Sequence, residues 1–416
     1  MAGHFKKSMT YREALRKTGP SAFSSMAKLA GASCNLECRY CYYLGKSALY
    51  DGRHQLMNED ILEEYIRQYI ELNAAPVVTF CWHGGEPLLA GKDYFGRIIE
   101  LQRKYSGDKK IENAVQTNGI LVDEEWCGFF RDNGFLVGIS LDGPEDIHDA
   151  YRTDREGRPT FGRVMKAVEM MSASGVEFNT LSVIDNLCEG RGAEVYRFLK
   201  SAGSRYMQFL PAVEYIAGGN IVPPGTQGSV RAEWSVSAEG FGRFMNDVFD
   251  QWVISDVGRC YVQMFDAALS HYVGLQPGLC SMAETCGDAL VVEHNGDVYS
   301  CDHFVYHEFL LGNIKETDMR SMLQSQRQFS FGLAKRNSLP EQCAGCKWLF
   351  ACRGGCPKHR FETTASGDAG LNTLCAGYKA FFSHTEPYMR FMAERLMAKQ
   401  PPALVMGWAR QRMGIG

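Results

Sequence analysis

Three closely spaced cysteines, Cys34, Cys38 and Cys41, constrain this chain more than any other feature. Their spacing, C-x3-C-x2-C, places three thiols on one short loop, where they can converge on a metal cluster. Each iron of a four-iron cluster needs its own ligand, so three thiols leave one iron open to a small molecule. The alternatives are buried cysteines that happen to cluster, or a structural zinc site, which needs a fourth Cys or His. The nearest candidate, His54, lies well beyond Cys41 in a polar loop, so the spacing favours an iron–sulfur cluster.

The composition narrows the possible functions. With 416 residues the chain can form two or three domains, and its net charge of -4 provides no basic field for nucleic acid. It contains no apolar run of about 18 residues or more that would span a membrane, and no apolar signal core near its start. We therefore expect a cytoplasmic protein whose 15 cysteines serve as ligands more than as disulfides.

Short apolar runs alternate with helical patterns from residue 21 onward. The runs cover residues 23–29, 77–82, 111–116, 135–141, 177–184 and 206–211, and a long helical pattern follows at 237–257. Such β/α pairs predict an α/β fold with a parallel sheet and right-handed crossovers, either doubly wound or barrel-like. Polar and glycine-rich residues follow most of the predicted strands, as they do at the mouth of (β/α) barrels. We therefore predict a partial (β/α)6 TIM-type barrel.

A second group of cysteines lies in the C-terminal part of the chain. Eight cysteines can complete two tetrads and close two clusters, although the spacing alone does not exclude two zinc ribbons. Three of the remaining cysteines, Cys81, Cys127 and Cys188, fall in strand or helix patterns and are expected to pack in the core, and Cys260 is assigned no chemistry. The eight are Cys280, Cys286, Cys301, Cys343, Cys346, Cys352, Cys356 and Cys375.

The cysteine loop, followed by an aromatic residue, and the Gly-Gly-Glu-Pro sequence at 84–87 together resemble the radical S-adenosylmethionine (SAM) enzymes. The resemblance implies a [4Fe-4S] cluster on Cys34, Cys38 and Cys41 whose open iron binds SAM. The ordinary alternatives are a capped turn for residues 84–87, a turn hydroxyl for Ser140 and a solvated base for Arg152. The SAM contacts that the resemblance implies are Tyr40, Gly84, Gly85, Glu86, Ser140, Arg152 and Val213.

The C-terminal cysteines resemble the SPASM extension, which holds two auxiliary [4Fe-4S] clusters and brings the expected total to three. In that family the tetrads interleave, which implies one cluster on Cys280, Cys286, Cys301 and Cys356. The other would lie on Cys343, Cys346, Cys352 and Cys375. We expect an N-terminal arm over residues 1–20, a radical SAM barrel over 21–258, a SPASM domain over 259–390 and a C-terminal tail over 391–416.

Residues 22–390 resemble the anaerobic sulfatase-maturating enzymes, through motifs such as 85–91, 136–144, 297–304 and 352–357. This implies oxidation of a Cys or Ser of a sulfatase polypeptide to Cα-formylglycine, with a flavodoxin- or ferredoxin-like reductant. Asp302, directly after Cys301, corresponds to the family's proton acceptor, and a solvated turn carboxylate is the alternative. Tyr43 and His83 are expected at the substrate. His83 replaces the Gln that members often carry, which leaves the substrate preference open.

The strongest competing function is a SPASM enzyme that forms thioether or other crosslinks in a ribosomal peptide. Many such enzymes carry an N-terminal peptide-binding domain, and we expect the short arm before the barrel to leave no room for one. A binding module without catalysis would not need residues 84–87 beside an open-iron loop. The resemblance therefore favours the maturase.

Overall fold

The computed structural model describes residues 22–50, 56–223, 226–287 and 289–415, so the predicted arm at 1–20 lies outside the described residues. Its central feature is a ten-stranded sheet with the order β10-β6-β5-β4-β3-β2-β1-β11-β12-β13. The first six strands run parallel, each beside the next in sequence, as the alternating pattern predicts. They are β1 (Ser24–Lys28), β2 (Val77–His83), β3 (Lys110–Thr117), β4 (Phe135–Ser140), β5 (Phe178–Ile184) and β6 (Tyr206–Pro211).

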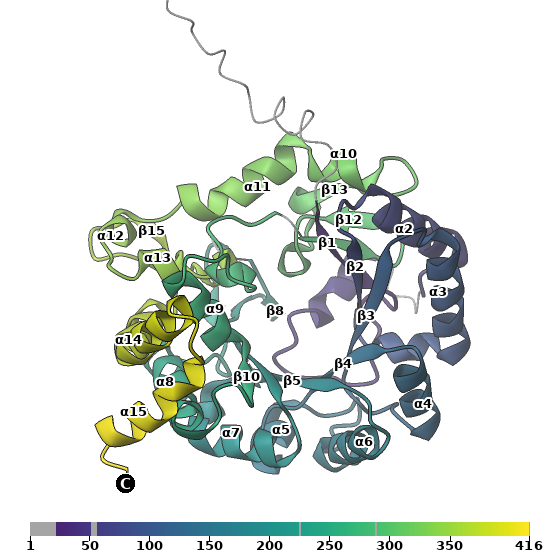
Figure 1. Ribbon diagram of the computed structural model, residues 1–416. Coiled ribbons are helices and arrows are strands. Elements are labelled where there is room, and N and C mark those ends of the chain that lie inside the picture. The colour runs from purple at the N-terminus through teal and green to yellow at the C-terminus, as the bar shows by residue number, and fades with distance from the viewer. Residues whose placement is uncertain (1–21, 51–55, 224–225, 288, 416) are drawn as a thin grey trace, which may run out of the picture.

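Helices cover the outside of this curved sheet (Figure 1). The first begins where Asn58 accepts a hydrogen bond from the Ile61 amide, and two acidic residues in its first turn complement the helix dipole. Its apolar face buries Leu62 and Ile66 against the sheet. The helices are α2 (Glu59–Leu72), α3 (Lys92–Tyr105), α4 (Glu124–Asp132), α5 (Glu145–Tyr151), α6 (Phe161–Ala173), α7 (Gly192–Ser201) and α8 (Ala238–Ser255).

The C-terminal part of the chain extends both edges of the barrel sheet. Strand β10 (Tyr261–Val262) pairs with β6, α9 (Gln263–Tyr272) follows it, and β11 (Ala289–Glu293) pairs in parallel with β1. Strands β12 (Asp297–Tyr299) and β13 (Leu310–Asn313) continue the sheet in antiparallel fashion. The sheet thus runs across the predicted boundary at 258/259, and the domain limits stay predictions.

A long helix, α14 (Cys375–Met397), packs the C-terminal part against α8 of the barrel. The predicted boundary at 390/391 falls inside α14, and beyond it α15 (Val405–Arg412) places Trp408 in a stacked contact with Phe391. The segment predicted as a tail is therefore helical and packed. The other elements here are α10 (Met319–Leu323), α11 (Gln326–Asn337), α12 (Glu341–Ala344), α13 (Leu349–Cys352), β14 (Glu362–Thr363) and β15 (Ala369–Leu371).

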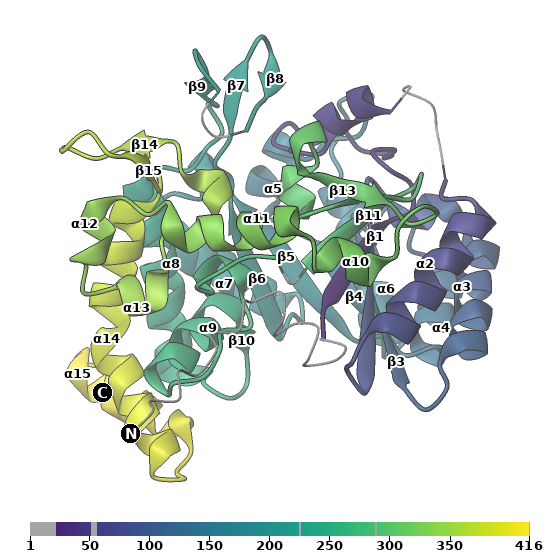
Figure 2. The same ribbon diagram turned by 90° about the horizontal axis from the view of Figure 1, so that it is seen from above.

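A small antiparallel sheet projects from the body of the molecule after β6 (Figure 2). It consists of β7 (Tyr215–Ala217), β8 (Asn220–Ile221) and β9 (Val230–Arg231), and the sequence pattern did not predict it. Tyr215 stacks on Phe361 with ring centres 3.7 Å apart, which ties this sheet to the C-terminal part.

Short 3-10 turns connect many of these elements. They are η1 (Leu44–Leu49), η2 (Pro87–Ala90), η3 (Asn186–Cys188), η4 (Cys280–Met282), η5 (Asp302–Phe304), η6 (His307–Phe309), η7 (Pro357–His359) and η8 (Pro402–Leu404). Within the described residues, no helix combines the length and the apolar character needed to cross a membrane.

Candidate active site

The cysteine loop leaves the end of β1 and is held by the turn that follows β2. The amide of Gly85 donates to the Gly31 carbonyl at 2.8 Å, and the amide of Glu86 donates to the Ser33 carbonyl at 2.9 Å. A β-carbon on Gly85 would lie 1.9 Å from the Ser33 oxygen, so only glycine permits this approach. The two motifs that the sequence analysis joined are thus in direct contact.

The three thiols of this loop suit a cluster. The amide group of Asn118 lies 3.6 Å from the Cys34 sulfur, and a guanidinium nitrogen of Arg152 lies 3.8 Å from the Cys38 sulfur. Burial raises the pKa of Cys34 to about 11 and that of Cys38 to about 12. Such thiols become thiolates when a bound metal supplies compensating positive charge. The donor set therefore fits the expected cluster.

Glu86 is fully buried and connects the turn after β2 to the end of β3 through hydrogen bonds. Its carboxylate accepts hydrogen bonds from the Leu88 amide at 3.0 Å, from the Thr117 hydroxyl at 2.8 Å and from the Asn118 amide at 2.8 Å. Burial raises the pKa of Glu86 to about 7, although these hydrogen bonds act to lower it. These contacts agree with the capping alternative, and a contact between Glu86 and SAM stays a prediction.

Asp142 connects two of the predicted SAM contacts, although the sequence analysis gave it no role. Tyr40 donates a hydrogen bond to its carboxylate, and Arg152 forms an ion pair with it at 3.2 Å. Arg152 is buried, so its interpretation as a solvated base is wrong. The signal that could have identified Asp142 is its place just after strand β4, close to Ser140 in the sequence. The hydroxyl of Ser140 accepts a hydrogen bond from the Gln116 side-chain amide at 3.1 Å.

Val213 follows β6 and is fully buried. Gly84 adopts a φ of 136°, and its amide donates to the Nδ1 atom of His83 at 2.8 Å. Both residues remain predicted SAM contacts.

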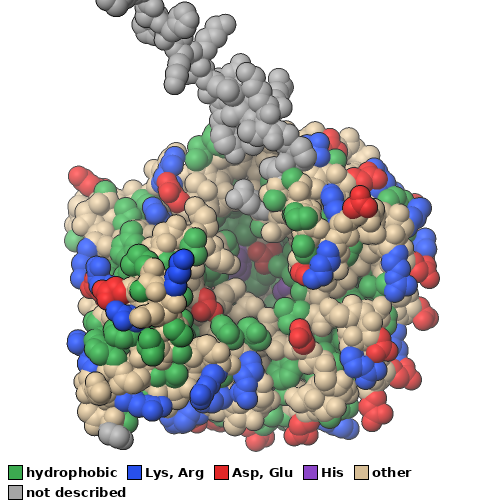
Figure 3. All heavy atoms as spheres, viewed as in Figure 1, with side chains coloured by type: hydrophobic (Ala, Val, Ile, Leu, Met, Phe, Trp, Pro, Cys, Tyr) green, Lys and Arg blue, Asp and Glu red, His purple; other side chains and the backbone are tan. Residues whose placement is uncertain are grey.

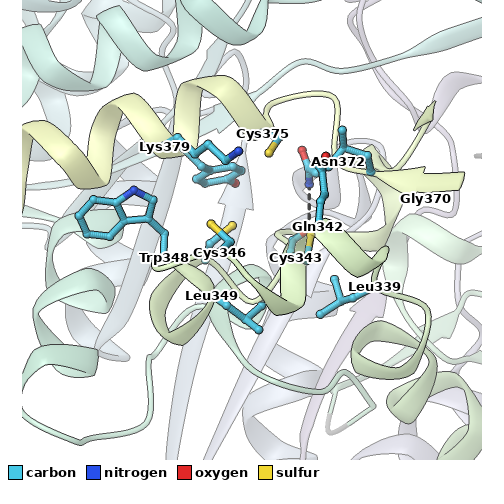
Figure 4. Close-up of a pocket in the computed structure, with 14 residues that line it drawn as sticks. Leu339, Gln342, Cys343, Cys346, Trp348, Leu349, Gly370, Asn372, Cys375 and Lys379 are labelled. Atoms are coloured by element: carbon cyan, nitrogen blue, oxygen red, sulfur yellow. Dashed lines mark hydrogen bonds between the residues drawn. The ribbon is translucent and has the colours of Figure 1, made fainter. Parts of the chain in front are cut away.

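One predicted auxiliary tetrad borders a single pocket beside the start of α14 (Figure 4). Its cysteines come from α12, the following loop, α13 and α14, and they are Cys343, Cys346, Cys352 and Cys375. The second tetrad is also brought together, since the Cys356 thiol interacts electrostatically with Cys280 and Cys286, and that of Cys301 interacts with Cys280 and Cys356. The interleaved pairing is therefore compatible with the fold.

Neither tetrad forms a tight mononuclear site. Across the described ranges, no three His, Cys, Asp or Glu side chains form a group that could hold one metal ion. Four thiols around one zinc ion lie about 3.8 Å apart, whereas a cluster places its irons between them. That each tetrad holds an iron–sulfur cluster stays a prediction.

Two buried cations lie beside these thiols. Lys335 donates hydrogen bonds to the carbonyls of Cys280, Ser281 and Ala283. Arg360 donates to the Ser338 hydroxyl at 3.2 Å and interacts electrostatically with thiols of both tetrads. Such cations offset the negative charge that cluster thiolates bring into the interior.

Asp302 lies where the cysteine loop meets the C-terminal part of the chain. Its carboxylate accepts a hydrogen bond from the Tyr42 hydroxyl at 2.9 Å. Burial acts to raise its pKa, but the nearby His303, Lys28 and His83 together with this hydrogen bond outweigh that effect and hold the pKa below its usual range. Asp302 is therefore an ionised carboxylate that keeps partial solvent exposure in a 3-10 turn, and its role as the proton acceptor stays a prediction.

The other two predicted substrate contacts, His83 and Tyr43, both lie beside Lys28. His83 ends β2, and its Nδ1 atom lies 3.3 Å from the Lys28 ammonium. Tyr43 is buried and donates a hydrogen bond to Glu293. Asp302, His83 and Tyr42 each keep partial solvent exposure. The molecular surface is hollowed at the centre of one face, with His and acidic side chains at the bottom (Figure 3).

Comparison with known proteins agrees with this geometry. A model of the radical SAM superfamily matches residues 30–199, and a model of an iron–sulfur cluster-binding domain, SPASM, matches residues 280–347. A serine-type anaerobic sulfatase-maturating enzyme of Bacteroides thetaiotaomicron is 45% identical over 388 residues, covering 92% of this chain and 94% of the relative. The chain belongs to the anaerobic sulfatase-maturating enzymes.

Other members of this maturase family are also similar to the chain. A cysteine-type anaerobic sulfatase-maturating enzyme of Clostridium perfringens is 33% identical over 90% of this chain and 99% of the relative. A solved structure, native anSMEcpe with bound AdoMet and Cp18Cys peptide, covers 90% of this chain and 99% of that chain at 31% identity, with a TM-score of 0.79. The predicted family membership and the radical SAM barrel with a C-terminal SPASM domain are thereby confirmed.

Proposed function

We propose that this maturase oxidises one Cys or Ser residue of a sulfatase polypeptide to Cα-formylglycine. The observation that carries the proposal is the position of Asp302. It follows Cys301 of the predicted auxiliary site directly and accepts a hydrogen bond from Tyr42 of the cysteine loop. A carboxylate between the two cysteine sets can receive a proton from a target side chain that reacts there. The relatives named serine-type and cysteine-type support both kinds of target.

The protein's own residues organise this reaction. When bound, the cluster of the cysteine loop and SAM supply the radical that takes a hydrogen atom from the Cβ of the target. Asp142 orients Tyr40 and Arg152 at the loop. Asp302 accepts the proton of the target hydroxyl or thiol, and its lowered pKa keeps the carboxylate ionised. With a Cys target this oxidation gives a thioaldehyde, which water converts to the aldehyde with release of hydrogen sulfide. Its neighbour Cys301 belongs to a tetrad that can hold an acceptor for the electron.

We further propose three [4Fe-4S] clusters, one on the cysteine loop and one on each C-terminal tetrad. A flavodoxin- or ferredoxin-like protein would supply electrons. We place the reaction in the cytoplasm, because an oxygen-sensitive cluster has to act on an unfolded sulfatase chain before export. Detection of the protein in a periplasmic fraction would contradict that location.

The direct test is an anaerobic assay. The protein is reconstituted with iron and sulfide, reduced, and given SAM with a peptide containing Cys-x-Pro-x-Arg or its Ser counterpart. We expect the Cys peptide to lose about 18 mass units and the Ser peptide about 2, with 5′-deoxyadenosine released. Release of 5′-deoxyadenosine without change in either peptide would reject the maturase function and favour another peptide substrate.

A further inference from the structure

Three side chains form a row across neighbouring strands at the bottom of the candidate active site. Lys28 at the end of β1 is in register with His83 of β2 on one side and with Glu293 of β11 on the other. Lys28 has no solvent exposure, and burying an ammonium group is costly unless partners compensate. The proposed function uses this lysine only as one of the charges near Asp302 and leaves its contact with His83 without a role.

The partners of Lys28 define what it can do. Its Nζ atom lies 3.3 Å from Nδ1 of His83 and 4.6 Å from the centre of the Tyr43 ring, whose hydroxyl donates to Glu293. The ring face contributes a cation–π interaction. Among the described residues, the side chain that accepts a hydrogen bond from this ammonium is the imidazole of His83.

The surroundings of Nδ1 determine where the imidazole carries its proton. Two donors point at Nδ1, the Gly84 amide at 2.8 Å and the Lys28 ammonium at 3.3 Å, against one acceptor, the Gly84 carbonyl at 3.2 Å. A proton on Nδ1 would oppose both donors, and a flipped ring would place a carbon there instead. Nδ1 is therefore the acceptor, and the proton resides on Nε2.

The Nε2 atom is available to a ligand. Among the described residues, Nε2 of His83 makes no hydrogen bond. It is not one of the buried side-chain nitrogens and oxygens that lack a partner. The atom is therefore unpaired but still accessible to solvent. Burial and the Lys28 charge lower the pKa of His83 to about 3, which keeps the ring neutral. The ring interacts electrostatically with the Asp302 carboxylate.

We propose that Lys28 is a positioning residue that locks His83 in the Nε2–H tautomer, so that His83 donates a hydrogen bond to the side-chain oxygen or sulfur of the target residue beside Asp302. The inference rests on the proposed function and deepens it. Because a hydroxyl oxygen accepts hydrogen bonds better than a thiol sulfur, this donor matters more for a Ser target than for a Cys target.

A double-mutant cycle tests the inference. Glutamine at position 83 donates from an amide that has no tautomers, so it does not need the lysine. In the wild-type background we expect Lys28→Met to lower kcat/KM for the Ser peptide about tenfold, the value of one hydrogen bond. In the His83→Gln background we expect the same change to cost less than about twofold.

Controls separate this role from a purely structural one. Lys28→Arg retains a donor toward Nδ1 and is expected to keep near wild-type activity. Iron content and SAM cleavage without peptide are expected to be unchanged in Lys28→Met, and its loss with the Cys peptide should be smaller than with the Ser peptide. If Lys28→Met binds no iron, the cycle is repeated with Lys28→Leu, and failure of both variants to bind iron would overturn the role.

The outcomes distinguish the two proposals. An equal loss in both backgrounds would mean that Lys28 acts on Asp302 or on the fold directly, which overturns the inference while formylglycine formation stands. If the wild-type protein cleaves SAM but forms no aldehyde from either peptide, the proposed function fails and this inference fails with it.

Discussion

At the scale of single residues, the site depends on buried carboxylates whose partners decide their charge. Asp302 is surrounded by histidines and a lysine, which hold its pKa low. Asp185, directly after β5, has its pKa raised by burial and by the nearby Asp142 carboxylate. One oxygen of Asp185 accepts from the Leu187 and Cys188 amides, while the other has no partner among the described residues. The same residue type thus has a lowered pKa at one position and a raised pKa at the other.

Replacing Asp302 tests its role as the proton acceptor. Asp302→Asn retains the size of the side chain and its contact with Tyr42 but is a very weak base. We expect formation of the aldehyde to fall by at least about a hundredfold, while SAM cleavage and iron content persist. Aldehyde formation at the wild-type rate would show that another group takes the proton. Asp132→Asn, at an exposed position on α4, serves as the control.

Asp185 predicts a pH dependence of stability. Burial raises its pKa to about 7, whereas the unfolded chain has a value near 3.9, so between these pH values the folded state binds more protons. The free energy of unfolding therefore falls as pH rises from about 4 to about 7. We expect Asp185→Asn to have a higher Tm than wild type at pH 8 and no advantage at pH 4. A constant difference across this range, measured by circular dichroism, would contradict the raised pKa.

At the scale of elements, close backbone approach positions the cysteine loop. In Gly85→Ala the new methyl group would meet the Ser33 carbonyl, so the loop or the turn has to move. We expect a loss of about 3 kcal/mol or more in the free energy of unfolding and a large loss of bound iron after reconstitution.

The matched control is Gly128→Ala in the interior of α4, where a β-carbon meets nothing within 4 Å. It should raise stability by roughly 0.5–1 kcal/mol and leave iron binding unchanged. Equal iron content in both variants would refute the role assigned to the Gly85 contact.

The sequence predicted the elements of the barrel well and the contacts between distant elements poorly. Apolar runs with turns between them located the six parallel strands within a residue or two, because the strand period and the helix period differ. The pairing of β11 with β1, and the ion pair of Asp142 with Arg152, join segments far apart in the chain. Local periodicity carries no information about such pairs.

The sequence could single out candidate cluster cysteines because their chemistry depends on residue type and spacing. The role of Lys28 was not predictable, since a single lysine in an apolar strand gains meaning only from its neighbours on β2 and β11. The small sheet at β7–β9 was also missed, because strands of two or three residues have too few positions to show a pattern.

At the scale of the whole molecule, three contacts lock the barrel to the C-terminal part. These are the continuous sheet, the buried ion pair of Lys358 with Glu214, and the crossing of α8 and α14 at two glycines. A β-carbon on Gly377 would lie 2.2 Å from the Ala238 carbonyl, so the two helices touch at their backbones. The auxiliary thiols therefore have a fixed position relative to the cysteine loop.

Gly377→Ala tests this crossing. We expect it to lower the Tm and to reduce aldehyde formation more than SAM cleavage, because the barrel keeps its own cysteine loop while Asp302 and the auxiliary sites shift. Gly407→Ala, on α15 with nothing within 4 Å of the added carbon, is the control and should leave both activities unchanged. A proportional loss of both activities in Gly377→Ala would show that the crossing supports the whole fold and not the placement of Asp302.

The measurement that tests the central claim most directly follows a hydrogen atom. A Ser peptide carrying deuterium at Cβ of the target residue is incubated anaerobically with the reduced, reconstituted protein and SAM. The mass of the released 5′-deoxyadenosine is then measured by mass spectrometry. We predict that deuterium appears in 5′-deoxyadenosine in proportion to the aldehyde formed, because the target Cβ is the source of the hydrogen. Unlabelled 5′-deoxyadenosine alongside labelled, unchanged peptide would contradict the proposed function.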